Sequence, residues 1–491
     1  MPETYIIGID QSTQGTKALL FDREARLVGR YDLPHEQKVN ELGWVSHDPE
    51  EIYRNTVRAV SGVLEQSGID RRKVAGIGIS NQRETALIWE KRTGKPLADA
   101  VVWQCARADA VCRRKEIAEQ AGRILDVTGL KLSPYFPAAK YAWLLEHTEG
   151  AREMAEKHAL CFGTIDTWLL YRMTGGKAYK TDYSNASRTQ LFDIFARKWD
   201  EELCRLFGLN PADLPEVCDS NSLFGETDLE GVLERPVPVH SMLGDSHAAL
   251  YGQGCLKKGN IKATYGTGSS IMMNIGEEPV RSSHGVVTSL AWGMNGTVQY
   301  VLEGNINYTG AVISWMKDQM GLIDSPGETE GLCFAAGKDD HLYFVPAFSG
   351  LGAPYWKSQA EGVLCGITRT TKKAEIVRAG VECIAYQIAD VIRAMEQDAG
   401  LAVEELRTDG GPTKNKYLMQ FQSDVLGAKL LVPEVEELSG RGAACACGIA
   451  LGVYQEAHLR GLMQTEYLPQ KDAAWREKKH TGWKQAVQKT G

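Results

Sequence analysis

The sequence lacks a long hydrophobic run and a basic leader. Its longest weakly polar stretch, residues 442–454, is built from small residues and is shorter than the roughly 20 apolar residues that a membrane-spanning helix needs. Residues 1–11 carry Glu3 and Asp10 where a secretory signal would carry positive charge. We therefore expect no transmembrane segment, no secretory signal and a cytoplasmic location.

Positive charge is also in short supply. Lys and Arg total 55 against 63 Asp and Glu, which gives a formal net charge of -8. This sign excludes a general electrostatic attraction to nucleic acids or to acidic membrane surfaces. An anionic ligand would have to be bound by a local arrangement of cations and backbone N–H groups.

Paired cysteine motifs are absent as well. The 11 cysteines are an odd number, lie scattered along the chain and include no Cys-x-x-Cys pair. This spacing does not support a disulfide framework or a structural zinc site. We expect reduced and mostly buried thiols.

The sequence does have the length and pattern of a two-domain α/β protein. Its 491 residues exceed one typical hydrophobic core. A helix is predicted to begin with Asp48 as its N-cap, with Pro49 at its first position and Glu51 completing a capping box. Around it, short apolar runs separated by polar turns predict strands at residues 5–10, 17–22, 26–32 and 74–80.

The second half shows a similar pattern, which indicates one architecture used twice. A long amphipathic helix is predicted over residues 373–397. The boundary is expected near residues 252–259, which gives two domains at residues 1–252 and 253–491. Strand candidates beside glycine-rich turns occupy residues 260–264, 270–275 and 299–303.

The first chemical motif is GIDQSTQGTKA, residues 8–18. A strand ends at Asp10, a turn of hydroxyl and glycine residues follows, and a second strand carries Lys17. Backbone N–H groups of such a turn can face phosphate oxygens, Lys17 adds a cation, and Asp10 can hold magnesium directly or through water. On these residues alone, phosphate binding and an ordinary tight hairpin remain equal interpretations.

Two further loops extend this pattern. KATYGTGSS, residues 262–270, repeats the strand, turn and strand, and TDGGPTKN, residues 408–415, precedes a helix predicted over residues 416–426. Glycines let the backbone approach a flat ligand, and the start of a helix offers free N–H groups. Three such loops favour a nucleotide clamped between two domains, with adenosine at the third loop, over three unrelated glycine turns.

With these motifs the sequence resembles the FGGY carbohydrate kinases, and within them the members that phosphorylate glycerol. The matching segments extend over nearly the whole chain through Tyr454. They include SNQRETALIWEK from Ser80, VVWQCARA from Val101, PYFPAAK from Pro134, TDYSNASRT from Thr181, GDSHAAL from Gly244, TYGTGS from Thr264, FVPAFSGLGAPYW from Phe344 and DGGPTKNKYLMQFQSDVLG from Asp409.

The resemblance implies two actin-like, ribonuclease-H-like domains with ATP and magnesium in the cleft between them. It implies Asp245 as the catalytic base, and Asp10 and Asp245 as residues on the metal. The polyol site is expected to include Arg83, Glu84, Trp103, Tyr135, Asp245, Ser246 and Ser270. The nucleotide site is expected to include Thr13, Gln14, Lys17, Thr267, Gly310, Gly411 and Asn415.

The implied activity is ATP-dependent phosphorylation of a terminal hydroxyl of a small polyol, with glycerol giving glycerol 3-phosphate. Ser246 and Ser270 stand where the glycerol-phosphorylating members usually have a glutamine and an aromatic residue. A larger substrate, such as a tetritol, a pentitol or a ketose of the xylulose type, therefore stays open. An actin-like or heat-shock-type ATPase is the alternative from another class. A homo-oligomer, dimer or tetramer, also stays open.

Overall fold

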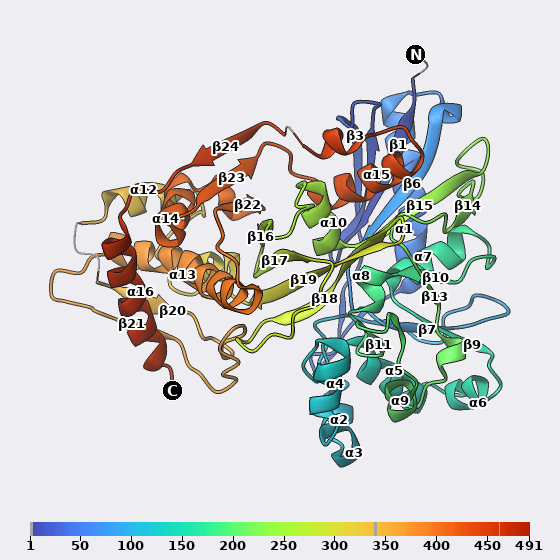
Figure 1. Ribbon diagram of the computed structural model, residues 1–491, viewed down its shortest axis with the longest axis horizontal. Coiled ribbons are helices and arrows are strands. Elements are labelled where there is room, and N and C mark those ends of the chain that lie inside the picture. Colours follow the sequence, from blue (N-terminus) through green and yellow to red (C-terminus); the bar gives the residue numbers. More distant parts are fainter. Residues whose placement is uncertain (1–2, 338–340, 461) are drawn as a thin grey trace.

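Two large sheets form the frame of the protein in a computed structural model, which describes residues 3–337, 341–460 and 462–491 (Figure 1). The sheet of the N-terminal part combines parallel strands at the centre with antiparallel strands at both edges. In space its strands follow the order β14 (Gly225–Thr227), β15 (Val237–Gly244), β6 (Val74–Asn81), β1 (Tyr5–Gln11), β2 (Gly15–Phe21) and β3 (Leu27–Pro34).

The sheet of the C-terminal part repeats the central arrangement and has one more strand. Its order is β18 (Val287–Met294), β19 (Thr297–Ile306), β17 (Ser269–Gly276), β16 (Ile261–Tyr265), β22 (Glu405–Asp409), β23 (Lys429–Pro433) and β24 (Gln464–Tyr467). β16 is antiparallel to β17 and parallel to β22, just as β1 is antiparallel to β2 and parallel to β6. The predicted α/β class and its repeated architecture are confirmed.

Helices cover both faces of the N-terminal sheet. α1 (Pro49–Ser67) and α7 (Ile165–Met173) bury apolar side chains against the face that carries Ile7 and Ile9. α10 (Asp245–Gly252) and α15 (Leu438–Ala450) pack on the opposite face, which carries Ile6 and Leu19. Since successive side chains of a strand point to opposite faces, β1 is buried on both sides.

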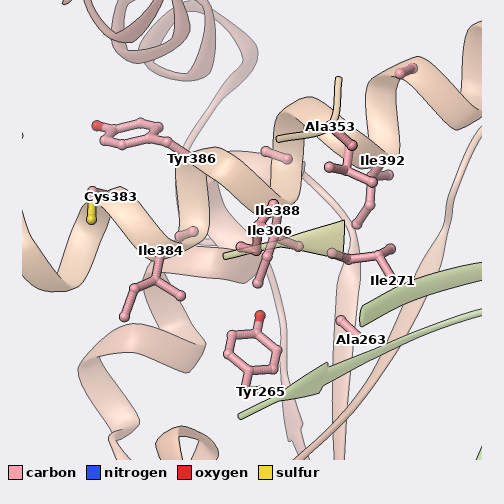
Figure 2. Packing of buried hydrophobic residues seen from close by; sticks show 14 of the residues in the cluster. Ala263, Tyr265, Ile271, Ile306, Ala353, Cys383, Ile384, Tyr386, Ile388 and Ile392 are labelled. Atoms are coloured by element: carbon pink, nitrogen blue, oxygen red, sulfur yellow. The ribbon is translucent and has the colours of Figure 1, made fainter. Parts of the chain in front are cut away.

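The C-terminal sheet packs on a long central helix, α13 (Lys373–Ala399). Figure 2 shows Tyr265, Ile271 and Ile306 of the sheet near Ile384 and Ile388 of this helix. Further helices of this part are α11 (Gly310–Asp318), α12 (Glu328–Ala335), α14 (Lys416–Leu426) and α16 (Ala473–Gln488).

A smaller α/β region is inserted in the N-terminal part between β6 and β14 (Figure 1). It carries several of the polar residues discussed below. Its elements are β7 (Leu87–Glu90), β8 (Ala100–Val101), α2 (Asp109–Cys112), α3 (Lys115–Ala118), α4 (Ala121–Thr128), α5 (Pro137–His147), α6 (Ala151–Glu156), β9 (Leu160–Gly163), α7, β10 (Lys180–Asp182), α8 (Tyr183–Ala186), β11 (Phe192–Asp193), β12 (Lys198–Trp199), α9 (Glu201–Leu206) and β13 (Glu216–Cys218).

α15 crosses from the C-terminal sheet to the N-terminal one. It follows β23 in the chain, yet it lies on β1, β6 and α10 (Figure 1). The approach is close because glycines face backbone: a Cβ on Gly8 would come within 2.5 Å of the carbonyl oxygen of Gly440, and one on Gly78 within 2.2 Å of that of Ala443. The small residues of RGAACACGIALG serve this contact.

Most predicted elements agree with the structure to within about two residues. Asp48 caps α1 by accepting the N–H of Glu50, but the predicted capping box is wrong. The Glu51 carboxylate instead accepts the backbone N–H of Glu36, which ties the start of α1 to the segment after β3. No strand is predicted from the sequence at β18, because its buried residues 287–293 show no alternation of apolar and polar side chains.

All 11 cysteines are free thiols, of which nine are buried and two half-buried. Within residues 3–337, 341–460 and 462–491, no helix has both the length and the apolar character to cross a bilayer.

Candidate active site

One face of the C-terminal sheet directs polar side chains toward the N-terminal part. Residues directly opposite each other in antiparallel strands share a face. Glu303 on this face contacts Arg83 and Arg188 of the N-terminal part. Strand register gives two neighbouring rows on the face: Lys262, Met272 and Glu303, and, nearer the turn at residues 266–268, Thr264, Ser270 and Asn305.

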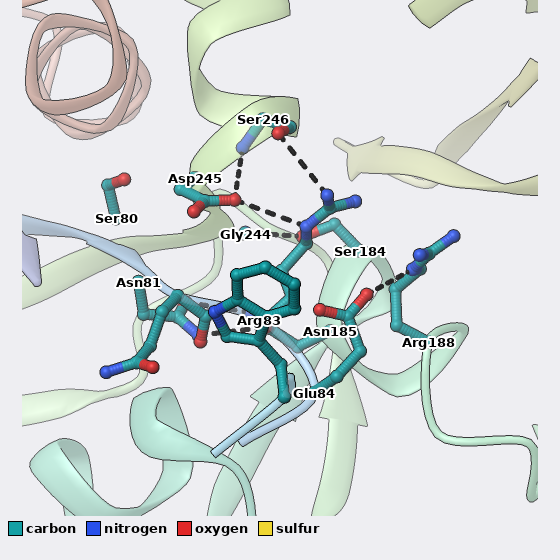
Figure 3. Close-up of polar contacts among 12 residues, drawn as sticks. Ser80, Asn81, Arg83, Glu84, Ser184, Asn185, Arg188, Gly244, Asp245 and Ser246 are labelled. Carbon is teal, nitrogen blue, oxygen red and sulfur yellow. Dashed lines mark hydrogen bonds and ion pairs between the residues drawn. The ribbon is translucent and has the colours of Figure 1, made fainter. Parts of the chain in front are cut away.

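Arg83 is the centre of the polar cluster shown in Figure 3. Its two terminal nitrogens donate to the Glu303 carboxylate at 3.0 and 2.9 Å. Its Nε lies 3.2 Å from Oδ1 of Asp245, and Nη2 also donates to Oγ of Ser246 at 3.3 Å. The structure therefore brings three of the predicted polyol-site residues together around one guanidinium group.

Glu303 is the buried counter-charge of this cluster. Its side chain is fully buried, and its Oε2 lies 2.9 Å from Nη1 of Arg188. Burial alone would raise the pKa of Glu303, but Arg188 and Arg83 hold it below its usual value. The carboxylate is therefore charged and shared by two arginines from the other half of the molecule.

Glu84 lies beside Arg83 in an uncommon backbone conformation. Its φ is 60°, in the left-handed region that costs a non-glycine residue of order 1–3 kcal/mol. Its carboxylate accepts the Nε of Arg188 at 2.6 Å, and both side chains are almost fully buried (Figure 3). This conformation fixes the Glu84 side chain in the same cluster as Arg83.

Asp245 is the first residue of α10. Its Oδ1 accepts the backbone N–H of Ser246 at 2.6 Å, in addition to its contact with Arg83. Its Oδ2 accepts no hydrogen bond from any residue that the structure describes, and the side chain is 36% exposed. One carboxylate oxygen is thus held in place while the other can meet a ligand.

Lys140 of α5 joins the backbone of three predicted polyol-site residues. Its ammonium donates to the carbonyl oxygens of Glu84 at 2.9 Å and Trp103 at 3.3 Å, and to that of Tyr135. Burial lowers the pKa of Lys140 to about 7. The Trp103 and Tyr135 rings lie 5.4 Å apart, centre to centre, so this one side chain sets the position of an aromatic wall.

The row Thr264, Ser270 and Asn305 is polar. Ser270 has a buried Oγ with no hydrogen-bond partner among the described residues. Asn305 donates to Oε1 of Glu303 at 3.2 Å. Because buried hydroxyls are nearly always hydrogen-bonded, the hydroxyl of Ser270 has unused capacity for a ligand or a water molecule.

The first phosphate turn joins β1 and β2. Asp10 accepts the Ser80 hydroxyl at 3.0 Å, and its Oδ2 lies 3.7 Å from the Lys17 ammonium. Burial raises the pKa of Asp10 to about 6 against the opposing effect of Lys17. Thr13 accepts the indole N–H of Trp103 at 2.9 Å, whereas Gln14 is exposed. The turn therefore contacts the aromatic wall directly.

The second turn carries Thr267 and is tied to the start of α11. The backbone N–H of Gly310 donates to the Gly266 carbonyl at 2.9 Å, and that of Ala311 donates to the Thr267 carbonyl at 3.0 Å. A Cβ on Gly310 would come within 2.8 Å of the Gly266 oxygen, which explains the glycine. Thr267 and Gly310, both predicted for the nucleotide site, are neighbours in the fold.

The third loop follows β22. Gly410 has a φ of 98°, and a Cβ there would come within 2.0 Å of the Tyr265 carbonyl oxygen, so only glycine fits. The space beside Gly411 is open. Asn415 caps α14 by accepting the N–H of Leu418 and donates to the Thr329 hydroxyl. These side-chain contacts hold the loop and the start of α14, and they do not involve the polyol-site cluster.

Sequence reasoning missed several charged residues of this site. Glu303, Arg188 and Lys140 act through contacts with distant segments, and only the buried charge itself could have drawn attention to them. His247, two residues after Asp245, is fully buried, and burial lowers its pKa well below the usual value.

Comparison with known proteins agrees with this geometry. Residues 5–252 match the model of the N-terminal domain of the FGGY family of carbohydrate kinases, and residues 261–451 match that of its C-terminal domain. The chain is 44% identical to glycerol kinase 1 of Thermotoga maritima, over 99% of each chain. It is 41% identical to a glycerol kinase of Stenotrophomonas maltophilia, over 100% of this chain and 99% of the relative.

Solved structures give the same result. The crystal structure of Plasmodium falciparum glycerol kinase with ADP superimposes with a TM-score of 0.93 at 35% identity, over 99% of this chain and 98% of that one. These matches decide against an actin-like or heat-shock-type ATPase that works only as a binding machine. The two-domain α/β fold, the two family models and the full-length relatives together show that this chain belongs to the FGGY family of carbohydrate kinases.

Proposed function

We propose that this kinase transfers the γ-phosphoryl group of ATP to a terminal hydroxyl of glycerol, giving glycerol 3-phosphate. The observation that carries the proposal is the placement of Asp245, with Oδ1 held by Arg83 and by the Ser246 N–H, and with Oδ2 open to a ligand. A carboxylate in this position can accept the hydroxyl proton as the oxygen attacks phosphorus. The glycerol kinases among the relatives support the substrate.

The remaining hydroxyls of the polyol would be held by Arg83 and Glu84. Arg83 offers N–H donors and Glu84 offers acceptor oxygens, which matches the needs of two adjacent hydroxyl groups. Trp103 and Tyr135 would cover the carbon chain. Because Arg83, Glu84 and Asp245 are fixed by buried contacts, little of the alignment has to be achieved during the reaction.

The residues present also fit Mg²⁺ with a nucleotide. Mg²⁺ usually binds through one or two carboxylates together with phosphate oxygens and water. Asp10 and Asp245 are such carboxylates, and the charge of Asp245 acts on the pKa of Asp10. The described residues hold no cluster of three or more His, Cys, Asp or Glu that would form a protein cage. When bound, Mg²⁺ would neutralise the phosphate charge that Lys17 and the turns also face.

The test is ADP release from ATP by the full-length protein with and without glycerol. We expect release to depend on glycerol, since a closed site excludes water as the acceptor. Asp245→Asn keeps the shape but removes the proton acceptor and should lower kcat by about 10² to 10⁴. A near-normal kcat in a folded Asp245→Asn protein would contradict the role of Asp245 as the proton acceptor. ADP release at the same rate without any polyol would contradict a polyol kinase activity.

A larger polyol or a ketose is the second candidate substrate. The observation that favours it is the Ser270 hydroxyl, which is buried, has no partner among the described residues and lies next to Asn305 in the sheet. The three hydroxyl groups of glycerol would all be bound by Asp245, Arg83 and Glu84. Glycerol would therefore leave the Ser270 hydroxyl without a partner, whereas a longer polyol could bind it. The measurement is kcat/KM for glycerol against four- and five-carbon polyols and ketoses, in the wild type and in Ser270→Phe. A clear preference for glycerol that Ser270→Phe leaves unchanged would exclude this candidate.

A further inference from the structure

Glu437 lies beside the first phosphate turn, although it is far away in sequence. Its Oε2 accepts the Lys17 ammonium at 2.7 Å. The same ammonium lies 3.7 Å from Oδ2 of Asp10, outside hydrogen-bond distance. Lys17 therefore has two carboxylates within reach and is bonded to the one that the proposed function does not use.

The Glu437 carboxylate is itself held in place. Its other oxygen, Oε1, lies 2.6 Å from Nη1 of Arg30, and the side chain is 8% exposed. The residue immediately precedes α15, whose Gly440 packs against Gly8 and next to the Cβ of Asp10. Because Arg30 and the helix fix Glu437, this carboxylate can act as a fixed anchor for the more exposed Lys17.

We propose that Glu437 is a positioning residue that keeps the Lys17 ammonium out of hydrogen-bond contact with Asp10, so that the Asp10 carboxylate remains free to bind Mg²⁺. The inference rests on the proposed function for the role of Asp10. Without the Glu437 charge, Asp10 would be the nearest anion to the Lys17 ammonium, and a shift of about 1 Å would bring the two groups from 3.7 Å into hydrogen-bond distance. A lysine paired with Asp10 would compete with Mg²⁺ for the same carboxylate.

The neighbouring residue shows that this segment contacts a second nucleotide loop. Glu436 lies 3.0 Å from the Lys414 ammonium of the third loop. Residues 436 and 437 therefore contact both the strand that carries Lys17 and the loop that carries Gly411. Glu434 is exposed and has no such contact among the described residues, which makes it a matched control.

The experiment measures binding of Mn²⁺, as a paramagnetic substitute for Mg²⁺, to the full-length protein at saturating ADP, from the spin-resonance signal of free Mn²⁺. Glu437→Gln should weaken Mn²⁺ binding about tenfold, whereas Glu434→Gln should not. In the Lys17→Met background, Glu437→Gln should have little further effect, because the competing ammonium is gone. No polyol and no turnover are required, so failure of glycerol phosphorylation would not affect this readout.

A purely structural role for Glu437 predicts a different result. In that case Glu437→Gln would lower the melting temperature and weaken Mn²⁺ binding equally with and without Lys17. Unchanged Mn²⁺ affinity in Glu437→Gln, equal effects in both backgrounds, or no Mn²⁺ binding by the wild type with ADP would each overturn the inference. Should Glu437→Gln not fold, Glu437→Asp withdraws the carboxylate from Lys17 while keeping the charge beside Arg30, and the same comparison applies.

Discussion

Lys140 joins three segments of the proposed polyol pocket through one side chain. One ammonium group has three N–H donors, and here they are directed to the carbonyls of Glu84, Trp103 and Tyr135. Burying a cation that has no carboxylate bonded to it costs folding free energy unless hydrogen bonds to groups such as these carbonyls compensate. We infer that Lys140 aligns the three segments of the pocket by holding these carbonyls.

Lys140→Met should therefore damage polyol use more than nucleotide binding. Three carbonyl oxygens would lose their donor, which costs about 1–3 kcal/mol for each group left unsatisfied. We expect KM for glycerol to rise at least tenfold while the dissociation constant of ADP stays within about twofold. Steady-state kinetics and calorimetric ADP titration measure the two quantities. An equal loss of both affinities would indicate general unfolding of the region instead.

Asp10 should give the enzyme an acidic limb in its pH profile. Burial raises its pKa to about 6, so the carboxylate gains a proton, and loses its attraction for Mg²⁺, as the pH falls through that value. We expect kcat/KM for MgATP to decline below about pH 6, and the decline to move to lower pH at higher Mg²⁺ concentration because the metal and the proton compete. A limb that does not respond to Mg²⁺ would assign the titration to another group.

At this scale the sequence predicts motif residues and misses their partners. Asp10, Lys17, Arg83 and Asp245 lie in contiguous segments whose turns and strand ends can be identified locally. The contact of Arg83 with Glu303 spans 220 residues and that of Lys17 with Glu437 spans 420, and no local pattern carries such pairings. The unpartnered Ser270 hydroxyl likewise depends on strand register, which only the folded sheet defines.

At the scale of elements, α15 connects the phosphate turn to the proposed catalytic helix. Its Gly442 lies on α10 so closely that a Cβ would come within 1.9 Å of the Ala248 carbonyl oxygen. The same helix lies on β1 and β6, at whose ends Asp10 and Arg83 are found. The sequence shows a run of small residues at 442–454, which permits close packing. It does not predict which element the helix packs on, because small side chains allow a close approach to any neighbour.

Gly442→Ala tests this packing. The added methyl group meets the backbone of α10 at Ala248 and Gly252, so α10 has to move, and we expect a loss of about 1–3 kcal/mol of stability together with a reduced kcat. Gly331→Ala in α12 is the control, because a Cβ there has open space and alanine favours a helix by about 1 kcal/mol. Thermal unfolding and initial rates measure both effects. Wild-type behaviour of Gly442→Ala would mean that α15 does not set the position of Asp245.

At the scale of the whole molecule, the two halves meet through a buried charge cluster. Glu303 belongs to the C-terminal sheet, and the two arginines that it neutralises belong to the N-terminal part. Arg83 in turn contacts Asp245. The way the two halves pack together therefore affects the position of the proposed base through the side chains of Glu303 and Arg83. The repeated architecture was predictable from the two strand patterns, whereas this junction was not, because it arises only when the two sheets face each other.

Glu303→Gln should separate the role of this junction in catalysis from its role in stability. Removing one partner of a buried ion cluster costs about 3–5 kcal/mol, because Arg83 and Arg188 lose their shared counter-charge. We expect a lower melting temperature and a kcat/KM for the polyol reduced at least tenfold. Arg188 keeps Glu84 as a partner and Arg83 keeps Asp245, so we expect the protein to fold with the cluster misaligned. The exposed Glu477→Gln on α16 controls for the loss of one negative charge. A lower melting temperature with an unchanged kcat/KM would show that Glu303 acts on stability alone.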